Sequence, residues 1–226
     1  EVELKKKKIV KKKAEQSDLT FLKKKELNKL KQSKLSKEAT ISILKNKEDS
    51  LTNAIKLKEI ETKKINNEIL SILENKKNNN KLTPEAKLIG DNFESNKGYL
   101  PWPVLSGTVI SKFGNVPHPV LSGITIMNNG IEISTTNNNV RSVFDGEVSK
   151  IIILPTGLKV IIIKHGDYLT VYSNIYNAKV KKGDLVKTKD EIGLLYKEKN
   201  KKNNVLGFQI WEGREKLNPS HWISGH

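Results

Sequence analysis

Residues 157–175 read GLKVIIIKHGDYLTVYSNI, and this stretch decides the fold class. The run from Val160 to Ile163 is apolar at every position, which predicts a strand that is buried on both faces and lies centrally in a sheet. The sequences GLK and HGD on either side of it are typical of turns. The segment YLTVYSNI, which follows HGD, carries a second strand signal.

Outward from this stretch, short strand signals recur between turns over the second part of the chain. They lie at 107–114, 130–134, 146–153, 184–196 and 205–212, in addition to 157–166 and 168–175. This part also holds every Trp and Tyr and nearly all the Gly and Pro. Many short strands separated by turns are typical of an all-β sandwich or barrel. We therefore predict a β domain over residues 98–226.

The first part of the chain has the composition of a helix. Residues 1–97 hold 25 Lys and 15 Asp or Glu, with one Gly and one Pro. Apolar residues recur at heptad spacing, which predicts a coiled-coil helical arm over residues 1–73. The heptad positions are Ile41, Leu44, Leu51, Ile55, Ile65, Ile69 and Ile72. The register breaks at 32–40, where an antiparallel hairpin could bend. Residues 74–97 are predicted to form a hinge, with the first helix ending near Leu73, and a short helix that begins at Pro84.

The charge and composition exclude several classes of protein. The chain has 226 residues and a net charge of +16. The arm has no Arg and one aromatic residue, Phe21, whereas proteins that bind nucleic acid rely on Arg and on aromatic stacking. We therefore expect no nucleic acid partner and interpret the Lys blocks as solvated helix faces. No Cys is present for disulfides or thiolate zinc sites, and no apolar run of about 18 residues could span a bilayer. The chain begins without Met or a signal-peptide core, which predicts a processed or trimmed piece.

The histidines do not form an obvious metal site. A zinc hydrolase needs about three converging ligands, commonly in closely spaced pairs. Here His118, His165, His221 and His226 lie in separate segments. No Ser lies in a nucleophile-elbow pattern either. The residues themselves thus predict no catalytic group, no metal and no other cofactor.

Seven segments, in one order, resemble the lysostaphin-type, or LytM-like, zinc endopeptidase domain. They are LPWPVLSGTVISKFG (100–114), NNGIEI (128–133), VRSVFDGEVSKI (140–151), VIIIKHGDYLTVYSNI (160–175), VKKGDLVKTKDEIG (180–193), VLGFQIWE (205–212) and LNPSHWI (217–223). LPWPV behind a Lys-rich coiled coil further resembles the EnvC-like murein hydrolase activators of bacterial cell division. The resemblance implies an all-β LytM-like domain of antiparallel sheets, preceded by an α-helical coiled-coil arm.

The chain departs from the active members of this family at the positions that supply their metal ligands and catalytic imidazoles. The imidazole positions hold Asn128, Asn174, Val205 and Gly207, and Glu132 stands at the remaining ligand position. One carboxylate cannot hold zinc against water. The resemblance therefore implies a pseudoenzyme without metal or catalysis. The alternative is a shifted alignment in which His118 or His165 serves as a ligand.

The resemblance implies that the metal-free groove binds a protein instead. In EnvC-like activators the groove engages a zinc-dependent N-acetylmuramoyl-L-alanine amidase and withdraws its inhibitory helix. The coiled coil couples to the FtsE-FtsX complex at the inner membrane, which implies a periplasmic protein. The residues expected to line the groove are Asn128, Glu132, Arg141, Tyr172, Asn174, Val205, Gly207 and Gln209. Arg141 would stand at the rim, or else form a surface salt bridge, and residues 74–97 are candidates for a restraint over the groove.

Two alternatives come from other classes of protein. The β domain could be a scaffold that binds peptidoglycan directly, because its positive charge attracts acidic wall polymers. The chain could also be a weak zinc endopeptidase with a different set of ligands. The sequence leaves open which amidase is the partner and whether the coiled coil forms within or between chains.

Overall fold

The computed structural model describes residues 1–78, 83–117, 125–197 and 202–225. The chain divides into two compact units, Glu1–Glu59 and Ile60–His226. Helix α1 (Val2–Asn78) accounts for the whole of the first unit beyond Glu1. Neither Gly nor Pro occurs before Pro84, so nothing interrupts the helix. It continues through 32–40, where Thr40 Oγ1 donates to the carbonyl of Ser36 at 2.9 Å, and the hairpin bend is therefore absent.

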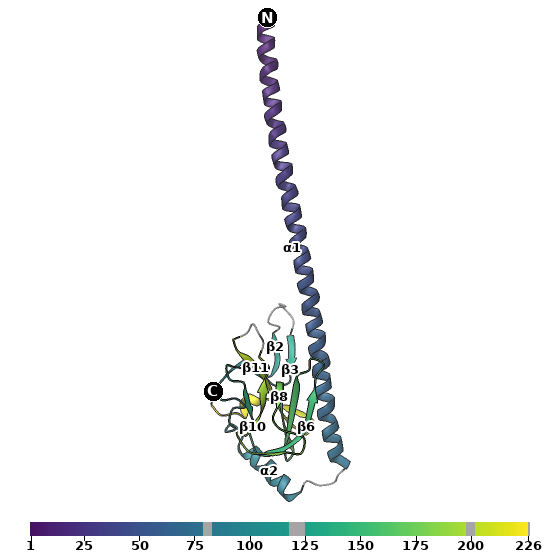
Figure 1. Cartoon of the computed structure of the whole chain (residues 1–226), viewed down its shortest axis with the longest axis vertical. Helices are drawn as coiled ribbons and strands as arrows, with labels where there is room; N and C mark the ends of the chain where they lie inside the picture. Colours follow the sequence, from purple (N-terminus) through teal and green to yellow (C-terminus); the bar gives the residue numbers. More distant parts are fainter. Residues whose placement is uncertain (79–82, 118–124, 198–201, 226) are drawn as a thin grey trace. The chain divides into compact units, whose positions relative to one another are not determined.

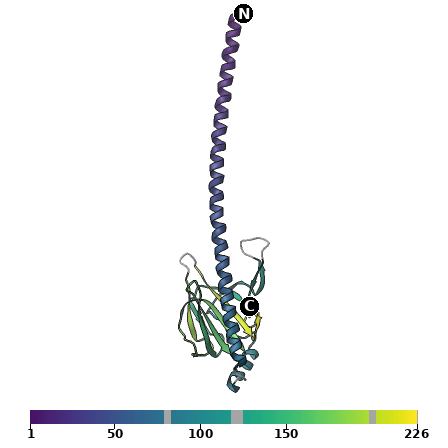
Figure 2. The same ribbon diagram turned by 90° about the vertical axis from the view of Figure 1, so that its right-hand side faces the viewer.

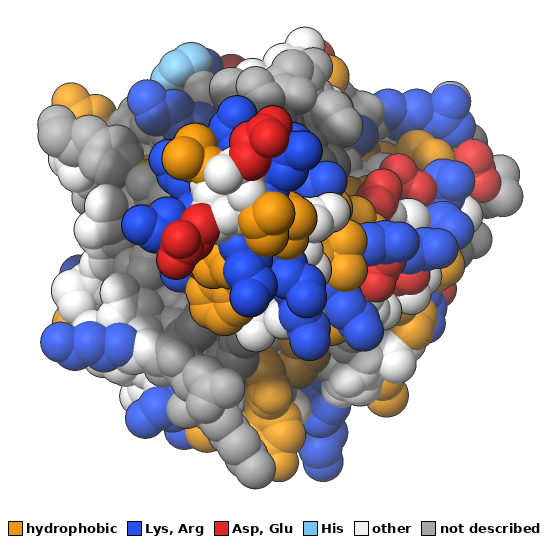
Figure 3. All heavy atoms as spheres, turned by 90° about the horizontal axis from the view of Figure 1, so that it is seen from above, with side chains coloured by type: hydrophobic (Ala, Val, Ile, Leu, Met, Phe, Trp, Pro, Cys, Tyr) orange, Lys and Arg blue, Asp and Glu red, His pale blue; other side chains and the backbone are white. Residues whose placement is uncertain are grey.

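The side chains of the first unit are largely exposed. Every residue from 1 to 54 is exposed, including the heptad residues Ile41, at 63% of its surface, and Leu44, at 58%. Lys and Arg side chains, blue in Figure 3, are distributed widely over the face shown there. Among the described residues, no helix combines the length and the apolar character that crossing a lipid bilayer requires.

The second unit is built on an antiparallel sheet (Figure 1). Its strand order is β1 (Thr108–Ser111), β4 (Ile131–Thr135), β11 (Asn204–Glu212), β8 (Tyr168–Ala178), β7 (Lys159–His165), β6 (Gly146–Ile153) and β9 (Leu185–Val186). β10 (Glu191–Leu195) pairs with β8 and β5 (Asn139–Arg141), and β12 (Glu215–Leu217) pairs with β11. A separate hairpin contains β2 (Gly114–Pro117) and β3 (Thr125–Asn128), and a 3-10 turn covers Pro219–His221. The prediction of an all-β domain of antiparallel strands behind a long helix is confirmed.

Strand β7 is central, as its sequence predicts. It pairs with β6 on one side and β8 on the other, and the residues from Val160 to Ile163 are all 0% exposed. Ile161 and Ile163 point into the larger of two hydrophobic cores, and Val160 and Ile162 into the smaller. Each face of the sheet therefore has its own core.

The last turns of α1 cover the smaller core, within the second unit. Ile65 and Ile69 are buried there against Val160, Ile162 and Trp211, among others. Polar contacts surround this interface. Lys150 pairs with Glu68, Thr156 Oγ1 donates to Glu61 at 2.7 Å, and Lys64 Nζ donates to the carbonyl of Ile153 at 2.6 Å. Figures 1 and 2 show these turns against the sheet. The helix ends at Asn78 rather than near Leu73.

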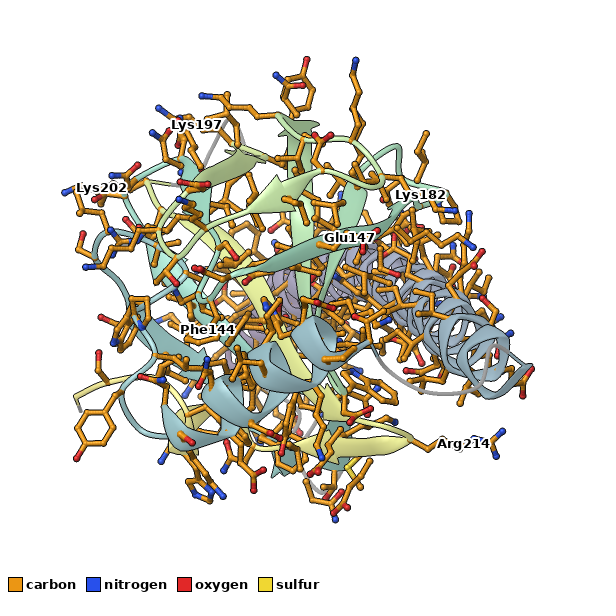
Figure 4. The ribbon with its side chains drawn as sticks, turned by 90° about the horizontal axis from the view of Figure 1, so that it is seen from below. Phe144, Glu147, Lys182, Lys197, Lys202 and Arg214 are labelled. Atoms are coloured by element: carbon orange, nitrogen blue, oxygen red, sulfur yellow. The ribbon has the colours of Figure 1, made fainter. Side chains whose placement is uncertain are left out.

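Helix α2 (Pro84–Ser95) begins at Pro84, as predicted, with Thr83 as its N-cap. It packs on the larger core through Phe93, which is fully buried. The ring of Phe93 stacks on His165 at 4.9 Å and on Tyr168 at 5.0 Å, and it meets Phe144 edge-on at 5.5 Å. Figure 4 shows Phe144 beside α2. Where the helix crosses the β7–β8 turn, a Cβ on Gly166 would lie 2.6 Å from the Cα of Gly90, so only Gly permits the contact.

The two ends of the β domain are bonded to each other. Gly98 N and Leu100 N both donate to the carbonyl of Trp222, at 2.9 and 3.0 Å. Ser224 N donates to the carbonyl of Leu100 at 2.7 Å, and Trp102 Nε1 donates to the carbonyl of Ser224 at 2.8 Å. These four bonds hold the segment LPWPV against the C-terminal segment.

Candidate partner-binding site

Residues alternate along β11 between two environments. Leu206, Phe208 and Ile210 are fully buried in the larger core. The intervening residues therefore point to the opposite face of the sheet. They are Val205, Gly207 and Gln209, which are partly exposed, and Trp211, which is buried in the smaller core under α1. The sheet face opposite the larger core is thus covered by α1 near Trp211 and partly exposed toward Val205.

The strand register places four short or polar residues in one row on this exposed part. Ser111 of β1 lies opposite Glu132 of β4, Glu132 lies opposite Gly207 of β11, and Gly207 lies opposite Ser173 of β8. All four are partly exposed. We call Ser111, Glu132, Gly207 and Ser173 the polar row, and the row together with Ser134, Val205 and Gln209 the polar face.

Six of the eight residues predicted for the groove lie on the polar face or at its edge. Glu132, Val205, Gly207 and Gln209 belong to it. Asn128 flanks it, because its side-chain amide donates to Ser111 Oγ at 3.1 Å. Asn174 flanks it as well, because its amide donates to the carbonyl of Val205 at 3.2 Å.

Three serines of the polar face were missed by the sequence analysis. Ser173 Oγ lies over Gly207, since a Cβ on Gly207 would be 2.2 Å from it. Ser134 follows Glu132 by two residues on the same strand and accepts from Asn203 at 3.1 Å. Strand alternation from Glu132 identifies Ser134 from the sequence, whereas Ser111 and Ser173 require the register between strands.

The prediction that Tyr172 lines the groove is wrong. Its side chain is 0% exposed and packs in the larger core beside Phe208, with ring centroids 5.3 Å apart. The hydroxyl accepts a hydrogen bond from the backbone N–H of Val143 at 3.1 Å. Burial raises the pKa of the Tyr172 hydroxyl above its ordinary value. Tyr172 therefore supports the domain from inside and does not meet a partner.

Arg141 has a different place from the one predicted. It lies at the end of β5, away from the polar row, and its guanidinium binds two backbone carbonyls. Nε donates to Trp102 at 3.0 Å, and the terminal nitrogen donates to Val104 at 3.1 Å. Arg141 thus fixes the segment LPWPV to the domain instead of supplying a charge at the rim.

His165 is not available as a metal ligand, because both ring nitrogens are engaged. Nδ1 lies 2.7 Å from the carbonyl of Asp145, so it must donate, and Nε2 lies 2.8 Å from Thr170 Oγ1 and accepts. The ring is fully buried, and burial lowers its pKa from 6.5 to about 4, against the opposing effect of Asp145. His118 and His226 lie outside the described residues, and His221 is exposed.

The buried neutral ring of His165 makes stability depend on pH. The unfolded chain takes up a proton near pH 6.5 and the folded chain only near pH 4, so stability is full above pH 6.5 and falls between these values. The difference between these two pKa values corresponds to a loss of about 3 kcal/mol in the free energy of unfolding. The pKa of Asp145 is lowered mainly by its hydrogen bond to Thr188, so its contribution to stability is present above its ordinary 3.8 and is lost only below that value. We expect urea titrations to show this slope, and His165→Gln, but not His221→Gln, to remove it. Equal stability at pH 7 and pH 5 would contradict the buried neutral ring.

The polar face does not fit a zinc ion. Among the described residues, no three His, Cys, Asp or Glu side chains lie close enough to hold a metal. Of the aligned ligand positions, Gly207 has no side chain, and Asn128 donates its amide to Ser111 Oγ and to the carbonyl of Lys112, while its Oδ1 accepts from Gly130. Glu132 alone remains as a ligand, which is too few for zinc.

Helix α2 does not cover the polar face, so this part of residues 74–97 does not restrain the groove as hypothesised, and residues 79–82 of the predicted hinge lie outside the described residues. Its buried residue Phe93 belongs to the larger core, on the other side of the sheet. The element beside the polar face is the end of α1. Trp211, buried under that helix, donates from Nε1 to Gln209 Oε1 at 3.0 Å. This bond connects the smaller core to the polar face.

Comparisons with known proteins give a family for the β domain. Residues 126–219 match the sequence model of peptidase family M23. A search of curated proteins returned no match. Solved structures with a similar chain include a zinc-containing peptidase from Vibrio cholerae, with 24% identity over 57% of this chain and a TM-score of 0.46. Helicobacter pylori Csd3 has 24% identity over 57% of this chain, with a TM-score of 0.47.

The SpoIIQ–SpoIIIAH pore-forming complex contains a third similar chain, with 23% identity over 56% of this chain and a TM-score of 0.45. The present chain covers 92% of that protein, but only 40% of the Vibrio cholerae peptidase and 36% of Csd3. The family match includes β4, β8 and β11 of the polar face but not β1. Over residues 126–219 the β domain of this chain is therefore similar to peptidase family M23.

Proposed function

We propose that this chain is a non-catalytic activator of peptidoglycan N-acetylmuramoyl-L-alanine amidases in bacterial cell division and daughter-cell separation. The observation that carries the proposal is the composition of the polar face. On a domain similar to peptidase family M23, this face presents one carboxylate, Glu132, among Ser, Gly, Val and Gln. A lone carboxylate cannot position a zinc-bound water, so we expect no hydrolysis by this chain.

A partly exposed, polar sheet face remains able to bind a helix or an extended peptide. The chain activates an amidase if it binds the open form of that enzyme more tightly than the inhibited form. In this proposal the amidase segment lies on the polar face, and Asn128 and Asn174 lie at the edges of the contact. The catalytic zinc belongs to the amidase.

We further assign helix α1 to coupling with the FtsE-FtsX complex at the inner membrane, which places the chain in the periplasm. The exposed heptad residues Ile41, Leu44 and Leu51 support a contact with a partner helix. Removal of residues 1–59 leaves the second compact unit whole. Removal of residues 1–97 would take Ile69 and Phe93 out of the two cores, so the shorter truncation is the better test of the arm.

Amidase activity on dye-labelled sacculi tests the proposal. Each purified amidase of the same bacterium is assayed alone, with the full chain, and with the chain heated beyond unfolding. We expect dye release to increase only with the folded chain and an amidase together. Dye release by the chain alone would show an enzyme, and no increase with any amidase would contradict activation.

Metal content gives a second measurement. We expect elemental analysis of the purified chain to find no stoichiometric zinc, and EDTA to leave its melting temperature unchanged, because bound metal would stabilise the folded state. One zinc per chain, removed by EDTA with a fall in melting temperature, would support the endopeptidase alternative.

A peptidoglycan-binding scaffold is the second candidate, and the net charge of +16 favours it. Binding to acidic wall polymers through dispersed Lys side chains is expected to weaken steeply with salt. Pull-down on purified sacculi at low and high salt separates the two functions. Strong sacculus binding without any effect on amidase activity would favour the scaffold.

A further inference from the structure

Glu132 is the one acidic side chain on the polar face. It is partly buried at the centre of β4, between Ser111 and Gly207 in the row. Within the described part of the chain, its carboxylate has neither an ion pair nor a side-chain hydrogen bond. A partly buried carboxylate without a cation costs solvation free energy that a partner's positive group can offset.

Small residues flank Glu132 in the polar row. Gly207 has no side chain, and Ser111 has a short one. Ser173 Oγ lies over Gly207 and donates to its carbonyl at 3.3 Å, so its lone pairs remain available on the same side of Glu132. Two acceptor groups, a carboxylate and a hydroxyl, therefore adjoin the same small residue.

Lys216, a cation on this side of the sheet, does not neutralise Glu132. Lys216 Nζ donates to Asn129 Oδ1 at 3.0 Å and lies 5.1 Å from the ring centroid of Trp211. Trp211 is four residues along β11 from Gly207, a distance of about 13 Å at the usual rise per residue. Lys216 is therefore held away from the polar row.

We propose that Glu132 is the recognition residue of this face and pairs with a Lys or Arg side chain of the amidase segment that binds there. An Arg is the better fit, because its planar guanidinium can bind the carboxylate with two nitrogens and still donate to Ser173 Oγ. The net positive charge of the chain repels basic surfaces of a partner in general. The carboxylate of Glu132 therefore favours a partner that places one basic residue at this one position. This inference rests on the proposed function and adds the chemistry of the partner.

The test is the affinity of the full chain for each purified amidase of the same bacterium, measured by biolayer interferometry at two salt concentrations. We expect Glu132→Gln to weaken binding by about 10-fold and Glu132→Lys by roughly 100-fold or more, with a smaller salt dependence in Glu132→Gln. Glu147→Gln is the matched control. Glu147 is exposed and lies by α2, on a different part of the unit (Figure 4), and this variant is expected to bind as the wild type does. An amidase variant with its basic residue changed to Glu is expected to restore binding to Glu132→Lys.

Failure of the proposed function and failure of the inference about Glu132 would give different results. If the wild-type chain binds no amidase, both the proposed function and this inference are overturned. If it binds, but Glu132→Gln and Glu132→Lys bind within twofold of it, the inference alone is overturned. A third result is that soluble muropeptides with a free amine bind at Glu132, whereas amidase binding does not depend on this residue. The partner of Glu132 is then the stem peptide, and the inference is again overturned. The melting temperature of Glu132→Gln is expected to be no lower than that of the wild type, because Glu132 has no ion pair to lose and the neutral Gln removes the cost of the partly buried charge.

Discussion

Replacement of Phe93 by Ala is expected to lower the free energy of unfolding by about 3–5 kcal/mol, the range for a buried Phe that leaves a cavity. Phe93 is fully buried and is the residue through which α2 joins the larger core. Its ring lies against four others, those of His165, Tyr168, Phe144 and Trp222. Collapse of the surrounding side chains is limited, because strands and turns fix three of these rings. Urea denaturation followed by tryptophan fluorescence measures the loss.

Phe21→Ala is the matched control for this variant. Phe21 is 69% exposed on α1, so its removal should change the free energy of unfolding by no more than about 0.5 kcal/mol. A Phe93→Ala variant as stable as Phe21→Ala would contradict the packing of α2 on the larger core. Amide exchange over residues 84–95 should rise in Phe93→Ala alone, since the helix would lose its buried side chain.

Replacement of Ile69 by Ala is expected to cost about 2–5 kcal/mol, because Ile69 is 0% exposed in the smaller core. Ile41 belongs to the same heptad series but is 63% exposed, and Ile41→Ala should cost less than about 1 kcal/mol. Urea denaturation at low protein concentration, with amide exchange over residues 60–74, measures both. Equal losses in the two variants would show that a partner helix covers Ile41 as fully as the sheet covers Ile69.

Ile69 and Ile41 show how much of the helix the sequence could predict. The 3-4 spacing identifies an apolar stripe and predicts a helix, and α1 is one. The spacing does not say what covers the stripe, because a helix partner and a sheet face both bury apolar residues at that interval. Ile65 and Ile69 were read as coiled-coil positions, and in the structure they pack on strands.

The strands were also predicted only in part. The apolar, β-branched segments were all found, since burial requires such residues. Strands β2, β3, β5 and β12 were missed, because GNVP, TIMN, NVR and EKL are short, exposed or polar. The segment 184–196, read as one signal, forms β9 and β10, which its central turn separates.

The candidate site was predicted in part, and Tyr172 shows why the rest was not. The resemblance implied that both Tyr172 and Asn174 line the groove, and regular strand alternation would place these two residues on one face. Asn174 adopts a φ of 67°, and the β7–β8 register shifts near it. Tyr172 keeps the regular alternation of β8 and points into the larger core, whereas the irregularity after it places Asn174 at the edge of the polar face. Asn adopts a positive φ more readily than most residues, but an Asn within a strand signal does not by itself predict a register shift.

The bonds between the two ends of the β domain bear on how the protein withstands pulling. Force applied to the chain just before Gly98 acts first on the hydrogen bonds to Trp222. It acts next on the bonds that join Leu100 and Trp102 to the C-terminal segment. These bonds join the first segment of the β domain to its last, so a force that separates these two segments acts on them directly. The first and last segments of the β domain therefore cannot separate without breaking all four bonds.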